Sequence, residues 1–279
     1  MNLTIGGIPL GHADTEAPSR FTGLIWGDVG SGKTPFALTA PPKVLYMLFD
    51  QDGDKSIKHV RHLYDPIDYT RVQASNLVDQ FFNPGTTTLK DLDKVLATGE
   101  YKSLVFDSVT AFLDLALVRG IELAAPKVTK GVKPDLIAPG LQGYGARSSI
   151  MKAAAMNLHA ICAKHNVNLI FVAHARESRD NDGNLTDVMP WLPGESGVQV
   201  PKNISEIWCL RQYEGQRRVY IRPWNVYRLM RTRMFLNEDK DNAFFPWRFD
   251  ANKWEGPGQI KNWLEEYDAG GQNKIAMPK

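Results

Sequence analysis

The sequence predicts an α/β fold, built on a mainly parallel sheet with helices on both faces and an antiparallel extension towards the C-terminus. Three observations support this prediction. Short, wholly apolar segments, typical of buried parallel strands, alternate along the chain with segments of helical periodicity. A glycine-rich turn joins the first apolar segment to the first helical one. After about residue 205, strand-like segments follow one another without intervening helices.

The first strand and the first helix flank the glycine-rich turn. Phe21–Trp26 is short and apolar and is predicted to be a strand, and Gly32–Ala40 is predicted to form a helix that ends at the two prolines that follow it. Lys43–Phe49 is a continuous apolar run, as expected for a strand buried on both faces. Thr88–Thr98 carries apolar residues along one helical face before a glycine, which predicts a helix and its end.

The middle of the chain continues the alternation. Ser103–Phe106 is a second candidate for a buried strand, and the helix Val109–Leu123 is expected after it. Ser148–Lys164 is rich in alanine, has one apolar stripe and is predicted to be a helix, and Asn168–Ala173 is predicted to be a third buried strand. Because parallel strands need long crossover connections, usually helices, this order predicts a parallel sheet.

The last third of the chain has a different character. Glu206–Arg211 and Arg217–Arg222 are strand-like, and Glu214-Gly215 between them indicates a hairpin. Val226–Phe235 is predicted to be a further strand, and Ile260–Tyr267 a short amphipathic helix. We therefore expect an antiparallel extension on the parallel part of the sheet.

The chain is expected to hold one core with short appendages. The motifs described below spread over most of the sequence, so the core is placed at residues 21–236. Residues 1–20 then form an N-terminal extension and residues 237–279 a C-terminal extension with the short helix. Ile5–Leu10 is a strand-like segment that can pair with a neighbouring subunit.

Composition excludes several classes of protein. The 279 residues are 43% hydrophobic, which excludes a disordered chain, and two cysteines cannot build a disulfide framework or a four-cysteine zinc site. No apolar run reaches the roughly 20 residues needed to span a bilayer, and the N-terminus does not resemble a signal peptide. We therefore expect a cytoplasmic protein. The net charge of +2 conceals an acidic first half and a basic second half, so an anion-binding surface is expected mainly in the second half.

The turn after the first strand matches the phosphate-binding pattern G-x-x-x-x-G-K-[ST] at every defined position. Its glycines let consecutive backbone N–H groups point at a phosphate, and the helix that follows adds its positive N-terminal end. The lysine is placed to reach the β- and γ-phosphates and the threonine to bind Mg²⁺. The sequence thus predicts an ATP–Mg²⁺ site at Gly27, Asp28, Val29, Gly30, Ser31, Gly32, Lys33 and Thr34.

Acidic residues follow two of the predicted strands. Asp107 ends the strand Ser103–Phe106 and is predicted to hold Mg²⁺; the alternative is that it caps the next helix. Many ring ATPases of the AAA+ type have a catalytic glutamate directly after this aspartate. Here the residue is Ser108, so the general base is expected elsewhere. Asp50-Gln51-Asp52-Gly53-Asp54 ends the neighbouring strand and supplies candidate carboxylates.

This order of motifs resembles the RecA-type ATPase core over about Phe21 to Phe235: a phosphate loop, a strand ending in acid-x-acid, a strand ending in Asp-Ser and a strand ending in a polar residue. More narrowly, the chain is similar to short phage-encoded RecA-core ATPases of recombination and single-strand annealing. The resemblance implies that Asp52 is the catalytic carboxylate, with Asp50 structural and Asp54 a rival base. It also implies that His174 senses the γ-phosphate and signals to a DNA-binding loop; the alternative is an ordinary core or surface histidine.

Arginines are concentrated in one stretch, Arg211–Arg233, with tyrosines and a tryptophan between them. One interpretation is a nucleic-acid surface, where arginines contact phosphates and aromatic rings stack on bases. Another is an arginine finger that reaches the ATP site of a neighbouring subunit. Arg231 and Arg233 would share one side of a strand and resemble the paired basic residues that RecA-type assemblies use in this way, and Arg228 is a further candidate. Solvated strand faces with surface ion pairs are the remaining alternative.

The resemblance also implies two loops that bind single-stranded DNA. Ala125–Gly145 and Ala175–Pro201 are rich in proline and glycine and are predicted to be long loops. Ordinary surface loops are the alternative. The candidate DNA-binding residues in and beside them are Lys127, Lys130, Lys133, Arg147, Arg176 and Arg179.

The sequence therefore leads to the hypothesis of a DNA-dependent ATPase that binds ATP and Mg²⁺ at a subunit interface. It would self-associate into a ring or filament on single-stranded DNA, and a single-strand binding protein is a further candidate partner. The alternatives are a nucleotide switch that loads or scaffolds a replication partner, a small-molecule P-loop kinase, and a replicative helicase.

Overall fold

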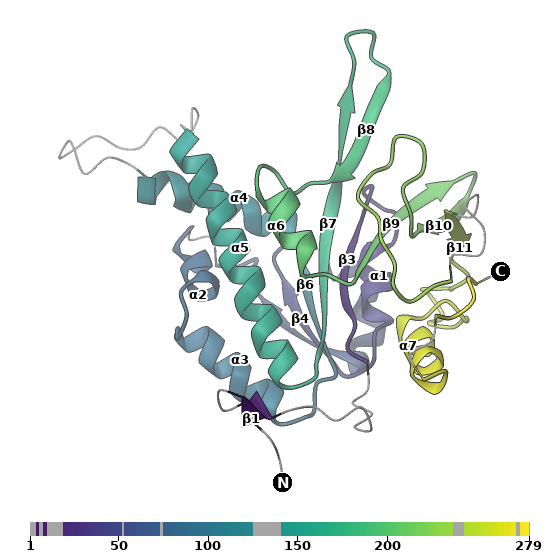
Figure 1. The fold of residues 1–279 in the computed structure, drawn as a ribbon, viewed down its shortest axis with the longest axis horizontal. Coiled ribbons are helices and arrows are strands. Elements are labelled where there is room, and N and C mark those ends of the chain that lie inside the picture. The colour runs from purple at the N-terminus through teal and green to yellow at the C-terminus, as the bar shows by residue number, and fades with distance from the viewer. Residues whose placement is uncertain are drawn as a thin grey trace.

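The computed structural model describes residues 4–5, 8–9, 19–51, 53–72, 75–124, 141–236, 243–271 and 274–278. One mixed sheet organises most of them (Figure 1). Its strands from β5 to β9 are parallel to their neighbours, whereas β10 and β11 are antiparallel. In spatial order the strands are β5 (Tyr64–Asp68), β4 (Val44–Leu48), β6 (Ser103–Asp107), β7 (Asn168–Arg179), β3 (Thr22–Gly27), β9 (Glu206–Tyr213), β10 (Gln216–Tyr220) and β11 (Phe244–Pro246).

Helices cover both faces of the sheet. The first face packs against η2 (Ser75–Val78), α2 (Asp79–Phe82), α3 (Thr87–Ala97), α4 (Val109–Ala124), α5 (Leu141–Lys164) and α6 (Ser196–Lys202). The second face packs against α1 (Lys33–Leu38), the 3₁₀ segment η1 (Lys55–Leu63) and α7 (Ile260–Ala269). Successive strand residues alternate between the two cores, with Leu24 and Trp26 in the first and Ile25 in the second, as the two-residue period of a strand requires.

The fold class predicted from the sequence is confirmed. Each of the predicted buried strands is present and forms part of the parallel sheet, because runs that are apolar at every position satisfy both cores at once. The predicted hairpin is also present: β9 and β10 pair through a turn at Glu214-Gly215, where both residues have positive φ. Cys162 and Cys209 are buried free thiols, and burial raises the pKa of Cys162 to about 12.

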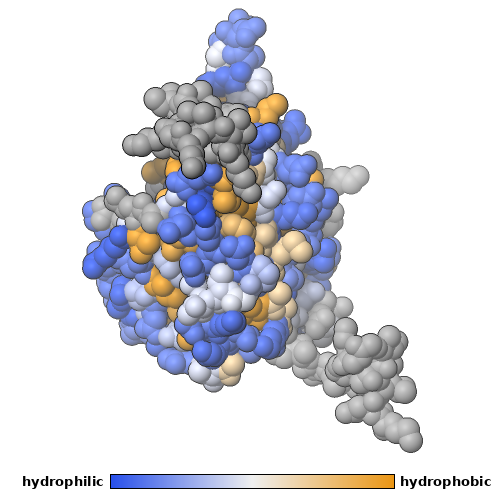
Figure 2. Space-filling model, turned by 90° about the vertical axis from the view of Figure 1, so that its left-hand side faces the viewer, coloured by the Kyte–Doolittle hydropathy of each residue, from blue (hydrophilic) through white to orange (hydrophobic). Residues whose placement is uncertain are grey.

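The predicted long loop at Ala175–Pro201 is wrong. β7 continues to Arg179 and pairs antiparallel with β8 (Leu185–Pro190), and this ribbon projects from the sheet at the top of Figure 1. Asp180 closes its turn by accepting hydrogen bonds from the N–H groups of Asp182 and Asn184, and Gly183 has a φ of +83°. Figure 2 shows the side of the molecule that carries α2, α3 and α5, and there the ribbon tip is hydrophilic.

The predicted strand Val226–Phe235 is also wrong. This segment makes only isolated bridges, such as Ile207 with Arg231, and Leu229 has a φ of +56°, which interrupts any extended run. The helix expected from Ser148 begins earlier, at Leu141, so the last residues of the predicted loop Ala125–Gly145 are helical. Ile5–Leu10 is split into the short strands β1 (Thr4–Ile5) and β2 (Ile8–Pro9), which pair with each other.

The C-terminal helix α7 lies beside α1 on the second face. The N–H of Ile260 donates a hydrogen bond to Oγ1 of Thr39 (3.1 Å), which ties the start of α7 to the end of α1. Trp263 is 4% exposed and its ring lies 6.0 Å from Phe36 and 5.8 Å from Trp208. The described residues after 243 therefore complete the core on the face of the sheet that carries α1. Among the helices that the structure describes, none has the length and apolarity to cross a bilayer.

Candidate functional site

The carboxyl ends of four neighbouring strands, β3, β7, β6 and β4, meet at one edge of the sheet. Gly27 at the end of β3 lies opposite His174 in β7, and Asp107 at the end of β6 lies opposite Val172 in β7. Asp50 comes two residues after the end of β4. The fold thus brings the phosphate loop and three titratable side chains together from four separate stretches of sequence.

The turn between β3 and α1 requires glycine at its two ends. A Cβ on Gly27 would lie 2.0 Å from the carbonyl oxygen of Leu210 in β9, and Gly27 has a φ of +153°. Gly32, which precedes the first residue of α1, has a φ of +94°. Both positions exclude larger residues, so the glycines of the motif serve the tight path of the loop. Ser31 between them has a buried hydroxyl with no hydrogen-bond partner among the described residues, as a group that contacts a bound phosphate would have.

Lys33 is enclosed by the loop. Its Nζ donates hydrogen bonds to the carbonyl oxygens of Gly27 (3.1 Å) and Asp28 (2.7 Å), and the residue is only 6% exposed. Burial lowers the pKa of Lys33, and the nearby carboxylates of Asp107, Asp28 and Asp50 act in the opposite direction. A partly desolvated cation in the first turn of a helix is suited to bind an anion.

Thr34 and Asp107 form an oxygen-rich pair next to the lysine. The Thr34 hydroxyl donates a hydrogen bond to Oδ2 of Asp107 (2.7 Å), and the Tyr46 hydroxyl donates a short one to the same oxygen. Asp107 is 3% exposed, and burial raises its pKa even though these two hydrogen bonds oppose the change. Burial and the neighbouring Asp107 raise the pKa of Tyr46 well above its ordinary value.

These residues fit Mg²⁺ held together with a phosphate. A hydroxyl and a carboxylate are the hard oxygen ligands that Mg²⁺ prefers, and this ion usually takes only one or two protein carboxylates and keeps its other positions for water and phosphate. Among the described residues there is no group of three or more His, Cys, Asp or Glu side chains that would form an all-protein metal cage. Thr34 and Asp107 are therefore the candidate metal ligands.

His174 and Asp50 face each other beside this pair. Nε2 of His174 lies 3.3 Å from Oδ2 of Asp50, and the backbone N–H of His174 donates to the Thr110 hydroxyl (3.0 Å). Nδ1 of His174 is buried and has no partner in the described part of the chain. Burial acts to raise the pKa of Asp50, but hydrogen bonds from His174 and Ser108 and the charge of Lys33 outweigh it and lower the pKa. Asp50 is therefore an anion at neutral pH.

The described carboxylates of the acidic turn after β4 make different contacts. Asp50, which the sequence interpretation treats as structural, lies in the site. Asp54 lies 3.6 Å from both Lys58 and Arg61 and precedes the first turn of η1, so its contacts are with that segment. Asp52, the predicted catalytic carboxylate, lies outside the described residues.

The two candidate finger arginines differ. The guanidinium of Arg231 donates short hydrogen bonds to the carbonyl oxygens of Pro201 and Ile204, so this cation is engaged at the end of α6 in its own chain. Arg233 is exposed, and its backbone N–H is held by Glu206 (2.8 Å). Because the segment is not a strand, the expectation that both side chains project from one strand face is not met.

Of the candidate DNA-binding residues, Arg147, Arg176 and Arg179 are in the described part. Arg147 stacks over Tyr144 of its own helix (5.0 Å), and burial lowers its pKa. Arg176 is exposed on the ribbon, whereas Arg179 donates to Glu177 (2.8 Å) and to the Gly183 carbonyl (3.0 Å). Lys127, Lys130 and Lys133 lie outside the described residues.

Two contacts of the site were not anticipated from the sequence. Arg211 in β9 forms an ion pair with Asp28 of the phosphate loop (Nε to Oδ2, 3.2 Å) and stacks over Tyr227 (4.2 Å). Tyr46, in the middle of an apolar run, reaches Asp107. Neither contact has a local sequence signal, because each depends on which strands become neighbours in the sheet.

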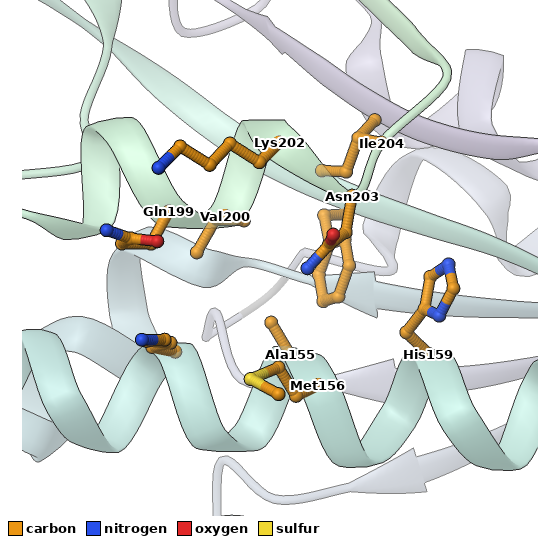
Figure 3. Close-up of a pocket in the computed structure, with 10 residues that line it drawn as sticks. Ala155, Met156, His159, Gln199, Val200, Lys202, Asn203 and Ile204 are labelled. Atoms are coloured by element: carbon orange, nitrogen blue, oxygen red, sulfur yellow. The ribbon is translucent and has the colours of Figure 1, made fainter.

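A separate pocket of about 210 Å³ lies between α5 and α6 (Figure 3). Ala155, Met156 and His159 line it from α5, and Gln199 and Val200 line it from α6. None of the candidate site residues belongs to its lining. It is therefore distinct from the site at the strand ends.

Comparison with known proteins identifies the family. A family model described as an AAA domain matches residues 19–227. Two RecA proteins from Thermus thermophilus are 27% and 28% identical to this chain over 177 residues, which is 63% of this chain and 43% of each relative, so the chain spans less than half the length of these relatives. A KaiC-like protein from Pyrococcus horikoshii aligns with 83% of this chain and 87% of its own at 14% identity, with a TM-score of 0.43, a likeness too low to carry an argument. The phosphate loop, the strand order and the family match agree, and the chain belongs to the AAA-domain family as a RecA-like P-loop ATPase.

Proposed function

We propose that this protein hydrolyses ATP with Mg²⁺ and couples hydrolysis to the binding of single-stranded DNA in recombination, annealing or replication. The observation that supports the ATPase part most directly is the cluster at the strand ends. Lys33 lies inside the phosphate loop, the Thr34 hydroxyl is bonded to Asp107, and the anionic Asp50 lies against His174. The phosphate-binding, metal-binding and water-activating parts of a phosphoryl-transfer site are thus each matched by a side chain of suitable chemistry.

In this proposal, different residues of the site bind the phosphates, hold Mg²⁺ and activate the attacking water. The loop N–H groups and Lys33 bind and orient the phosphates, and Thr34 and Asp107 would hold Mg²⁺, which neutralises charge on the phosphates when it is bound. A carboxylate of the turn after β4 accepts a proton from the attacking water. Asp52 remains the first proposal for this base, and Asp50 is the described alternative, because its lowered pKa keeps it ionised.

His174 is placed to pass the state of the nucleotide to the ribbon β7–β8. Its side chain contacts Asp50, while its own strand continues directly into the ribbon. On the returning side, the N–H of Trp191 donates to the His174 carbonyl oxygen (2.7 Å). A shift of His174 on binding or loss of the γ-phosphate would therefore act on both strands of the ribbon, at the base where they leave the sheet.

The proposed DNA contacts are Arg176 on the ribbon together with Lys127, Lys130, Lys133 and Arg147. The ribbon alone is not a basic surface, since Glu177, Asp180, Asp182 and Asp187 outnumber its two arginines. This charge favours a second candidate function for the ribbon, namely contact with a basic surface of a protein partner. The protein would then be a nucleotide-dependent loader or scaffold.

ATP turnover with and without single-stranded DNA tests the proposal. We expect DNA to stimulate turnover at about 50 mM salt and the stimulation to decline as salt rises, because phosphate contacts release counterions. Arg176→Ala is expected to reduce stimulation, whereas Lys90→Ala, an exposed lysine on α3, serves as the matched control. If single-stranded DNA neither stimulates turnover nor binds at low salt, the DNA part of the proposal is contradicted and the nucleotide switch is favoured.

For an arginine that acts between subunits, Lys33→Ala protein is mixed with Arg233→Ala protein. Each variant assembly is expected to be inactive alone, and mixed assemblies are expected to recover part of the activity because some interfaces combine an intact loop with an intact arginine. No recovery in assemblies shown to contain both chains would contradict the role of Arg233.

A further inference from the structure

The pocket between α5 and α6 lies apart from the nucleotide site and is mainly apolar inside. Its volume of about 210 Å³ offers room for one large aliphatic or aromatic side chain. The buried side chains of Ala155, Phe171, Val200 and Ile204 form the interior, and Figure 3 shows Ala155 and Val200 on opposite sides of it. An interior of this kind favours an apolar guest.

Two large apolar side chains are exposed on the helices that form the pocket. Met156, which lines it from α5, is 52% exposed, and Val198 on α6 is 58% exposed. Val198 lies four residues before Lys202, which is another lining residue, so both project from the same side of α6. Methionine adapts its flexible side chain to a partner and is common at binding surfaces. Apolar surface is therefore present both inside the pocket and on the helices around it, as expected for contact with another protein.

The charged groups around the pocket are cationic. Lys152 on α5 and Lys202 at the end of α6 are exposed, the lining includes no carboxylate, and no ion pair of either lysine is found among the described residues. The guanidinium of Arg231 donates to the carbonyl oxygens of Pro201 and Ile204, so the end of α6 also carries a positive charge. The surface around the pocket is thus complementary to an acidic partner.

His159 adds a hydrogen-bond donor to the wall of the pocket. Nη2 of Arg20 lies 3.0 Å from Nε2 of His159, and Nε2 accepts this hydrogen bond because a guanidinium has only donors. Burial and the charge of Arg20 lower the pKa of His159, so the ring is neutral at pH 7 and its proton is on Nδ1. Nη1 of Arg20 is buried and has no hydrogen-bond partner within the described residues. This wall therefore offers donors and a further positive charge.

We propose that the α5–α6 pocket is a docking site for an acidic peptide segment of a protein partner. The segment inserts one large apolar side chain between the helices and places carboxylates against Lys152 and Lys202. Nucleic acid fits less well, because two exposed lysines offer few phosphate contacts and a mostly aliphatic interior is a poor platform for bases. The inference goes beyond the proposed ATPase function, since none of the candidate site residues lines this pocket.

Fluorescence anisotropy with synthetic peptides tests the proposal. The probe is a labelled peptide with one central phenylalanine between aspartates. Two matched peptides replace the phenylalanine by alanine or the aspartates by lysines. The wild-type protein is expected to bind the probe, to bind the alanine peptide at least about tenfold more weakly, and not to bind the lysine peptide, because the anchor and the charge both contribute.

Substitutions in the protein test the cationic rim. Lys152→Gln/Lys202→Gln should weaken binding of the probe about three- to tenfold, the size of two exposed ion pairs, whereas Lys152→Arg/Lys202→Arg should retain it. Lys90→Gln/Lys102→Gln removes two exposed lysines outside the pocket and is the matched control. Equal affinities in the two glutamine variants would contradict the role of Lys152 and Lys202.

Nuclear magnetic resonance of isotope-labelled methionine methyl groups locates the bound peptide. The probe should shift the signal of Met156, which is identified by its absence in Met156→Leu, and leave the signal of Met189 on the ribbon β7–β8 unchanged. A shift of Met189 without Met156, or no binding of the probe by wild-type protein, would overturn the proposal. A shift of Met156 with single-stranded DNA but not with the probe would also overturn it, and would make the pocket a nucleic-acid site.

The outcome is separable from that of the ATPase proposal. Lys33→Ala protein should bind the probe as the wild type does, and Lys152→Gln/Lys202→Gln protein should bind ATP as the wild type does. Failure of the peptide proposal therefore leaves the nucleotide site unaffected, and absence of ATP binding leaves the peptide site unaffected.

Discussion

Asp107 connects the first turn of α1, directly after the phosphate loop, to the sheet through hydrogen bonds. One of its oxygens accepts hydrogen bonds from Thr34 in the first turn of α1 and from Tyr46 in β4. The carboxyl group is fully enclosed, and this burial raises its pKa. If Asp107 holds Mg²⁺ as proposed, the protonation state of this carboxyl group controls whether the cation binds.

A raised pKa of Asp107 predicts a pH-dependent role for Mg²⁺. As the pH falls, Asp107 takes up a proton at a higher pH than an ordinary aspartate, and the proton competes with Mg²⁺ for the same oxygen. The Mg²⁺-dependent part of ATP affinity should therefore decline as the pH falls from neutral, starting at a higher pH than it would with an ordinary aspartate. Calorimetry with and without Mg²⁺ across this range measures it. Asp107→Asn should show little Mg²⁺ dependence at any pH; an unchanged Mg²⁺ effect in that variant would contradict the assignment.

Tyr46→Phe removes one of the two hydrogen bonds to Asp107 without changing the packing of the ring. Because hydrogen bonds to charged groups contribute more than neutral ones, the free energy of unfolding should fall by about 1.5–3 kcal/mol in urea titrations. Tyr69→Phe is the control, since Tyr69 is a partly buried tyrosine packed against the core on the other face of the sheet, and no hydrogen bond of its hydroxyl is found within the described residues. Equal losses in both variants would show that the Asp107 contact is not what stabilises the fold.

Among the secondary-structure elements, the buried strands were predictable and the ribbon β7–β8 was not. Strands such as β4 and β6 are apolar at every position because each is covered on both faces, and that pattern is visible locally. The ribbon leaves the sheet, has solvent on both sides and so carries polar residues throughout, which makes it look like a loop. Its one usable signal was the Asp-Gly pair in the turn at Asp182-Gly183.

The site was predictable only where chemistry follows directly from a local motif. The phosphate loop, Asp107 and His174 each follow a predicted strand, whereas the contact between Asp50 and His174 arises because β7 and β4 lie on either side of β6. Strand order is set by tertiary packing. The engagement of Arg231 with the end of α6 has the same origin, since the two segments are about thirty residues apart.

Glu206 anchors the irregular segment that carries Arg233. Its buried carboxylate accepts hydrogen bonds from Nε1 of Trp208 (3.1 Å), the Thr232 hydroxyl (2.6 Å) and the Arg233 N–H (2.8 Å). Glu206→Ala should lower the free energy of unfolding by about 2–4 kcal/mol because several buried donors lose their acceptor. Glu265→Ala, at an exposed position of α7, should change it by less than about 0.5 kcal/mol. A small loss at Glu206, measured by urea denaturation, would contradict the anchoring role.

At the scale of the whole molecule, the C-terminal segment completes the core on the face that carries α1. The ring of Trp263 contacts those of Phe36, Trp208, Phe235 and Phe245, at centroid distances of 5.3 to 6.0 Å. Phe36 lies in α1, the helix that begins with Lys33. The aromatic cluster therefore packs against the helix that follows the phosphate loop. The nucleotide site thus depends on residues from the first and last parts of the sequence.

Trp263→Ala should therefore destabilise the whole core and not α7 alone. Removing a buried tryptophan costs about 3–5 kcal/mol through lost contacts and the cavity left behind. Thermal unfolding followed by circular dichroism should show one transition at a lower temperature. Two separate transitions, with the main one unchanged, would mean that the C-terminal segment folds independently of the sheet.

Mg²⁺-dependent ATP hydrolysis by the wild-type protein, beside Lys33→Ala and Asp107→Asn, tests the central claim most directly. The site geometry predicts turnover that requires Mg²⁺ in the wild-type protein and a loss of about a hundredfold or more in each variant, because each removes a charged group that acts on the phosphates. Circular dichroism checks that both variants are folded, so that a loss of turnover does not reflect unfolding. Turnover in Lys33→Ala equal to that of the wild type, or no turnover in wild-type protein with Mg²⁺ and single-stranded DNA present, would contradict it.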